Sequence, residues 1–155
     1  MLVIKSSIVF LKYRMEDMTD TNKDFILRLK AVIDTAIDGI LTIDDKGIVE
    51  TMNPAAASLF GYHTNEVIGN NIKMLMPSPY QSQHDGYLKR YHDTKEPRII
   101  GIGREVKGMT KSGHIFPFRL AVSEVILNDR VIYTGVVHDL TDVKQAESKI
   151  IRLNK

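Results

Sequence analysis

The sequence predicts an α+β fold: one five-stranded antiparallel sheet with helices packed on one of its faces. Three observations lead to this prediction. Two short apolar runs come first, a helical middle region follows, and three longer runs with alternating apolar residues come last. Strands that follow one another through short turns pair antiparallel, and the helical region between them can cover one face of the sheet.

The first two strands are expected within residues 39–52, with Gly47 in the turn between them at a position that suits positive φ. Asn53 and Pro54 then predict a helix start, because asparagine caps a helix N-terminus and proline fits its first position. Gly61 is expected to end this helix.

The last three strands are expected at residues 98–108, 115–127 and 131–138. Pro117 predicts a local irregularity near the start of the second of them. Apolar residues alternate along this strand, as in a strand that is buried on one face only. They are Phe116, Phe118, Leu120 and Val122.

The chain of 155 residues is expected to hold one domain, at residues 24–142, which begins with an entry helix. Residues 1–23 are expected to be a peripheral tail. Lys5 and Lys12 interrupt its apolar start, which is shorter than the roughly 20 residues that a membrane span needs. No membrane span is predicted. Residues 143–155 are expected to form a C-terminal helix with coiled-coil character.

Both flanking helices carry apolar stripes. Val143, Ala146, Ile150 and Leu153 recur at coiled-coil spacing in the C-terminal helix. A similar stripe from Phe25 onward in the preceding helix fits two interpretations. That helix either carries a signal and pairs with a second copy, or simply covers the domain.

A helix with a central histidine is expected between the two groups of strands. Its apolar positions recur at helical spacing and include a histidine on the inward side. They are Tyr80, His84, Tyr87, Leu88 and Tyr91. Gly86 costs about 1 kcal/mol relative to alanine inside a helix, which suggests that something bulky approaches the backbone there.

An apolar pocket entered by His84 and approached by Arg90, Arg98 and Arg104 calls for a matching ligand. The ligand should be flat and apolar, bind nitrogen and carry anionic groups. Haem meets these conditions, because its iron takes an axial imidazole and its propionates suit arginine side chains.

Residues 84–88, 90–91 and 98–102, with Arg104, closely resemble the haem-binding PAS domain of the FixL oxygen-sensor family. The similarity covers most of residues 25–145. It implies a PAS fold in which His84 is the proximal ligand of a non-covalent haem b. It also implies that Arg104 is the ligand switch, leaving a propionate to hydrogen-bond oxygen on the iron.

The same resemblance implies further cofactor contacts. Arg90 and Arg98 would hold propionates, and an apolar set would line the pocket and exclude water. That set is Tyr87, Leu88, Ile99, Leu120 and Val122. Gly103 departs from the acidic residue expected beside the arginine, which affects how tightly Arg104 is held.

Composition excludes several other classes. A net charge of +2 gives no case for nucleic acid or an anionic membrane as partner. The absence of cysteine excludes a thiolate-bound haem, covalent C-x-x-C-H attachment, a zinc–cysteine site and a flavin–cysteine adduct, and suits the cytoplasm. No catalytic constellation occurs, and Gly101 with Gly103 lacks the third glycine of a dinucleotide fingerprint.

The resemblance therefore implies a sensory domain and not an enzyme, with dioxygen, carbon monoxide or nitric oxide as ligand. Its output would be a two-component histidine kinase, in trans or in a longer chain, and its terminal helices would form a homodimer. Two rivals stay open. One is a haem-free PAS interaction module whose cavity is filled by side chains, and the other is a PAS domain that holds a different ligand such as flavin.

Overall fold

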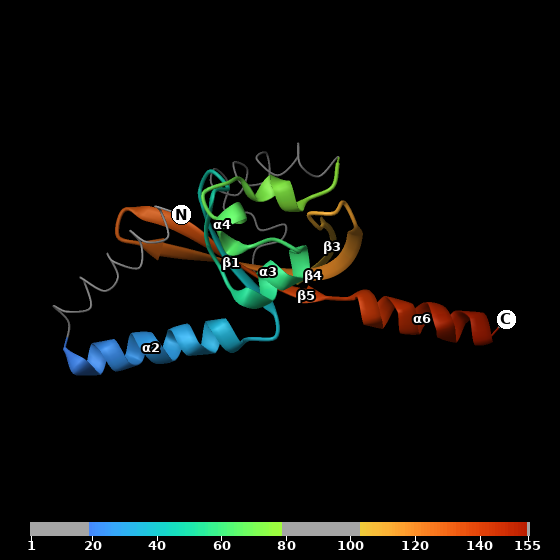
Figure 1. Cartoon of the computed structure of the whole chain (residues 1–155), viewed down its shortest axis with the longest axis horizontal. Helices are drawn as coiled ribbons and strands as arrows, with labels where there is room; N and C mark the ends of the chain where they lie inside the picture. Colours follow the sequence, from blue (N-terminus) through green and yellow to red (C-terminus); the bar gives the residue numbers. More distant parts are fainter. Residues whose placement is uncertain (1–18, 79–102, 155) are drawn as a thin grey trace. The chain divides into compact units, whose positions relative to one another are not determined.

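The computed structural model describes residues 19–78 and 103–154 (Figure 1). The chain divides into two compact units, one ending at Ala36 and the other beginning at Ile37. The described part of the first unit is helix α2 (Asp20–Thr35), in which no residue is buried. Two ion pairs join side chains four residues apart on this helix, one between Arg28 and Asp24 at 2.9 Å and one between Lys30 and Asp34.

The second unit contains a five-stranded antiparallel sheet in the order β2-β1-β5-β4-β3. This confirms the predicted fold class, and Figure 1 shows the strands in one layer. The strands are β1 (Gly39–Asp44), β2 (Val49–Met52), β3 (Arg104–Met109), β4 (Ile115–Leu127) and β5 (Arg130–Asp139).

Short helices cover one face of the sheet, which we call the inner face. They are α3 (Pro54–Phe60), α4 (Thr64–Val67) and the 3₁₀ helix η1 (Ile72–Leu75). The inner face is defined by the buried side chains Leu41, Phe116, Phe118 and Val137. The opposite side is the outer face.

The predicted turns and caps around α3 are present. Gly47 and Gly61 both have positive φ, at 85° and 75°. The Asn53 side chain accepts hydrogen bonds from Ala56 N at 3.0 Å and from Ile40 N at 2.8 Å. This asparagine is only 2 % exposed, so one buried side chain fixes both the helix start and the adjoining strand.

Two strand predictions need correction. Gly103 lies outside the strand, so within the described residues β3 begins at Arg104, while residues 98–102 of the predicted strand lie outside them. Pro117 causes no irregularity, because it pairs in regular register with Lys107. Its carbonyl accepts from Leu140 N at 3.0 Å on the β5 side, beyond the last pair between β4 and β5. The proline N therefore faces that side too, and no hydrogen bond to β3 is lost.

Helix α6 (Thr141–Leu153) follows β5 directly (Figure 1). Its start is anchored, because Asp139 accepts hydrogen bonds from the backbone N and the hydroxyl of Thr141, at 2.9 and 2.6 Å. No residue of the helix is buried, and Val143, Ile150 and Leu153 are well exposed. None of the described helices is long and apolar enough to cross a membrane.

Candidate functional site

Three of the residues predicted for the pocket share the inner face of the sheet. Arg104 pairs with Leu120 across β3 and β4, two positions along from the pair Val106 and Phe118. Because side chains alternate along a strand, Arg104 and Leu120 lie on the same face as Phe118. Val122 lies two residues beyond Leu120 and so joins them.

One half of this inner face is closed by aromatic packing. The ring of Phe60 lies edge-on to Phe116 and Phe118, with centroids 5.4 and 6.0 Å away. A Cβ at Gly108 would lie 2.7 Å from Phe118 and 2.9 Å from Phe60, so only glycine fits there. We call these four residues the aromatic half.

The other half is built differently and contains the three predicted residues. Leu120 and Val122 are half-buried, and Arg104 is exposed. Gly135 pairs with Val122, and a Cβ there would be in ordinary contact with Leu120 at 3.5 Å. We call Arg104, Leu120 and Val122 the open half.

The open half therefore offers an apolar wall with a guanidinium at its edge. This fits a flat apolar ligand with anionic groups, which is the chemistry of haem. Within residues 19–78 and 103–154, no three His, Cys, Asp or Glu side chains group to hold a metal ion.

The remaining predicted site residues lie outside the described residues. They are His84, Tyr87, Leu88, Arg90, Arg98 and Ile99. The structure thus brings together Arg104, Leu120 and Val122, and the roles of the other six stay predictions.

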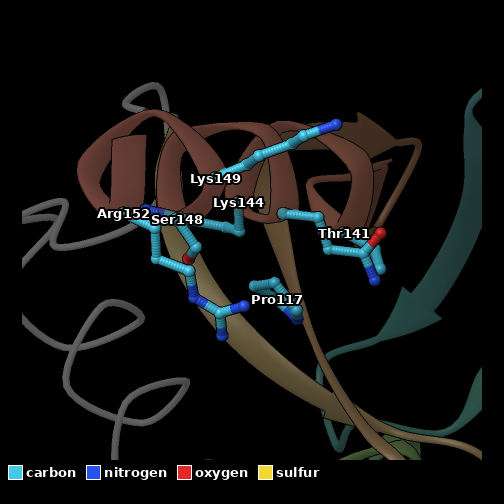
Figure 2. Close-up of a pocket in the computed structure, with 7 residues that line it drawn as sticks. Pro117, Thr141, Lys144, Ser148, Lys149 and Arg152 are labelled. Atoms are coloured by element: carbon cyan, nitrogen blue, oxygen red, sulfur yellow. The ribbon is translucent and has the colours of Figure 1, made fainter. Parts of the chain in front are cut away.

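A groove that sequence reasoning missed lies on the outer face, between Pro117 of β4 and helix α6 (Figure 2). Its volume is about 600 Å³. In Figure 2, the side chains of Ser148 and Arg152 lie on the side of α6 toward Pro117. The helix contributes six polar residues, three of them basic, to the lining: Thr141, Lys144, Gln145, Ser148, Lys149 and Arg152.

Lys144 also joins α6 to the sheet. Its Nζ lies 2.9 Å from a carboxylate oxygen of Glu105 on β3 and 3.7 Å from Glu147 on its own helix. The hydrogen bond to Glu105 raises the pKa of Lys144. The helical spacing of residues 141, 144, 148 and 152 was the available sequence signal for this face, but nothing in the sequence pointed to Glu105.

A second ion pair fixes the turn after β3 to the helical layer. Lys111 pairs with Glu66 of α4, and Lys111 N donates to Phe60 O at 2.9 Å. Glu66 also accepts from His63 N at 2.8 Å. The hydrogen bond from Lys111, and then that from His63, lowers the pKa of Glu66.

The chain has similarity to characterised sensor proteins. The sensor protein FixL of Bradyrhizobium diazoefficiens is 39% identical over 125 residues, which cover 81% of this chain and 25% of FixL. The oxygen sensor protein DosP of Escherichia coli is 34% identical over 114 residues, covering 74% of this chain and 14% of DosP. The chain thus spans a quarter or less of the length of these relatives.

Solved structures agree on the fold. The PAS domain of an HTR-like protein from Haloarcula marismortui has a TM-score of 0.63 at 17% identity, covering 83% of this chain and 98% of that one. Residues 27–140 match the family described as the PAS fold. With the five-stranded sheet and its helical layer, this match shows that the chain belongs to the PAS family.

Proposed function

We propose that the chain is an oxygen-sensing haem b PAS domain of FixL type, in which gas binding controls a signalling output. The observation that carries the proposal is the pair of Arg104 and Leu120 beside Val122 on the inner face. The similarity to FixL and to the oxygen sensor DosP supports it. The output would be a histidine kinase, in trans or in a longer chain.

In this proposal each residue of the site has a distinct role. His84 would hold the iron, and Arg90 and Arg98 would pair with the propionates. Tyr87, Leu88 and Ile99, with Leu120 and Val122, would contact the ring and exclude water. Haem, when bound, would supply an iron that binds dioxygen, carbon monoxide or nitric oxide.

Arg104 would make the site selective. Its guanidinium donates charge-assisted hydrogen bonds, which are strongest to acceptors that carry negative charge. Dioxygen gains more negative charge than carbon monoxide when it binds a ferrous iron, so it is the better acceptor. A gas that interacts differently with two arrangements of Arg104 shifts the balance between them, as a switch requires.

The proposal includes a homodimer through the terminal helices. Both α2 and α6 expose apolar side chains, including Phe25 and Val32 in one and Ile150 and Leu153 in the other. A single helix of this length is marginal in water unless its apolar stripe packs against something. The same observation favours the alternative, a haem-free interaction module, which would dimerise without taking up haem.

The test compares two arginines on opposite faces of neighbouring strands. We expect R104A to weaken oxygen binding about tenfold or more while changing carbon monoxide binding much less, because a hydrogen bond from a charged group is lost. R119A is the matched control, since Arg119 lies one position from Leu120 and therefore on the outer face. Equal losses for both gases, or an equal effect of R119A, would remove the switch role from Arg104.

A further inference from the structure

Arg104 and Glu105 are successive residues of β3 and lie on opposite faces of the sheet. Arg104 belongs to the open half on the inner face. Glu105 lies on the outer face, where its carboxylate forms an ion pair with Lys144 of α6, at 2.9 Å from Nζ. One strand therefore carries the proposed gas switch on one side and holds the C-terminal helix on the other.

β3 is one of the two edge strands of the sheet. Within the described residues it is paired with β4 alone, whereas β4 and β5 have neighbours on both sides. A small twist or slide of β3 therefore disturbs the hydrogen bonds to one neighbouring strand only. It must move Arg104 and Glu105 together, because they are adjacent on one backbone.

Helix α6 is held in a way that allows it to respond. Its first turn is fixed by Leu140 N, which donates to Pro117 O at 3.0 Å. The groove of about 600 Å³ then lies between Pro117 and the later turns, and no residue of the helix is buried. The pair of Glu105 and Lys144 lies between the fixed start and these exposed turns.

We propose that the ion pair between Glu105 and Lys144 is the contact through which the open half controls the C-terminal helix. A rearrangement at Arg104 shifts β3, the shift changes the pair, and the pair changes the order of α6 beyond Lys144. This inference rests on the proposed role of Arg104. Exposed ion pairs contribute little to stability, so this one can respond to a ligand without endangering the fold.

A row of polar and charged side chains on the outer face extends this contact across the sheet. Glu105 pairs in register with Arg119 on β4, and Arg119 pairs with His138 on β5. His138 Nδ1 lies 2.7 Å from Asp38, directly before β1. The row therefore runs from Lys144 at the start of α6 to the segment through which the chain enters β1.

Hydrogen exchange of the α6 amides in the full chain tests the contact. We expect E105Q and K144Q each to speed exchange in α6 several-fold, and the double variant to do no more than either alone. E50Q is the matched control, because Glu50 forms a two-bond pair with Arg130 between β2 and β5, away from α6. Unchanged exchange in E105Q would overturn the inference.

Gas binding and coupling are read separately. The visible spectrum of the haem-loaded chain reports whether oxygen binds, and we expect it to be the same in E105Q as in the unaltered chain. We expect oxygen to change α6 exchange in the unaltered chain and in E50Q, but not in E105Q. A gas effect that persists in E105Q would overturn the inference while leaving the proposed function standing.

If the chain takes up no haem, the proposed function is wrong, but the inference can still be tested without a ligand. R104A, E105Q and the double variant form a cycle whose readout is again exchange in α6. Non-additive effects support coupling through the pair. Additive effects, or no effect of R104A, would overturn it.

Discussion

The aromatic half and the open half of the inner face share strands β3 and β4 but are packed differently. Phe60, Phe116 and Phe118 fill the first half so completely that Gly108 has no room for a methyl group. In the second half, Leu120 and Val122 are only half-buried beside the exposed Arg104. The difference indicates that the aromatic half contributes more to the stability of the fold than the open half does.

The largest effect should come from removing the ring that joins the aromatic half to α3. We expect F60A to lower the free energy of unfolding by about 3–5 kcal/mol, through lost burial and an unfilled cavity. L120A, in the open half, should cost roughly 1–2 kcal/mol because that side chain is half-exposed already. Urea unfolding followed by circular dichroism measures both, and equal losses would remove the distinction between the halves.

Gly108 and Gly135, one in each half of the inner face, test the same comparison with smaller expected effects. G108A forces a methyl group into three phenylalanine rings, so we expect a loss of about 1–3 kcal/mol. G135A meets only an ordinary contact at 3.5 Å and should leave stability unchanged or raise it by up to about 1 kcal/mol. Thermal unfolding of the two variants side by side would show this. A destabilised G135A would mean that the open half is as tightly filled as the aromatic one.

The smallest effect is expected at the ion pair that borders the aromatic half. Lys111 lowers the pKa of Glu66, so the folded chain keeps this carboxylate charged at lower pH than the unfolded chain does. The resulting stabilisation is complete above the ordinary value of 4.5 and is lost as pH falls through the lower pKa of the folded state. As pH falls through this acidic range, the free energy of unfolding should therefore decrease less steeply in E66Q than in the unaltered chain.

K111Q is the matching variant, because it removes the other partner of the pair. It should make stability depend less on pH over the same acidic range, as E66Q does. A slope in E66Q equal to that of the unaltered chain would show that the pair with Lys111 contributes nothing measurable.

Much of the fold could be predicted because local patterns determine it. Alternation along residues 115–127 gave both ends of β4 as the structure has them, and Asn53 with Pro54 marked the start of α3. The prediction of an irregularity at Pro117 was wrong because the effect of a proline in a strand depends on which neighbouring segment its missing N–H would face. That neighbour, Leu140, is distant in sequence, so the pattern around the proline does not contain the answer.

The site was predicted less completely, for a related reason. Periodicity and resemblance selected Arg104, Leu120 and Val122, which the register brings to one face. The bond between Glu105 and Lys144 depends on where α6 leaves the sheet, which no local pattern specifies. Contacts between elements that are far apart in sequence come from the packing of the whole sheet.

The most direct test of the central claim is one absorption spectrum of the purified chain mixed with haem. Our account predicts uptake of one haem per chain and a Soret band that moves when oxygen or carbon monoxide is added to the reduced protein. H84A should lose this spectrum, whereas H114A, in the turn before β4, should keep it. No haem uptake by the unaltered chain, or an unchanged spectrum in H84A, would contradict the account.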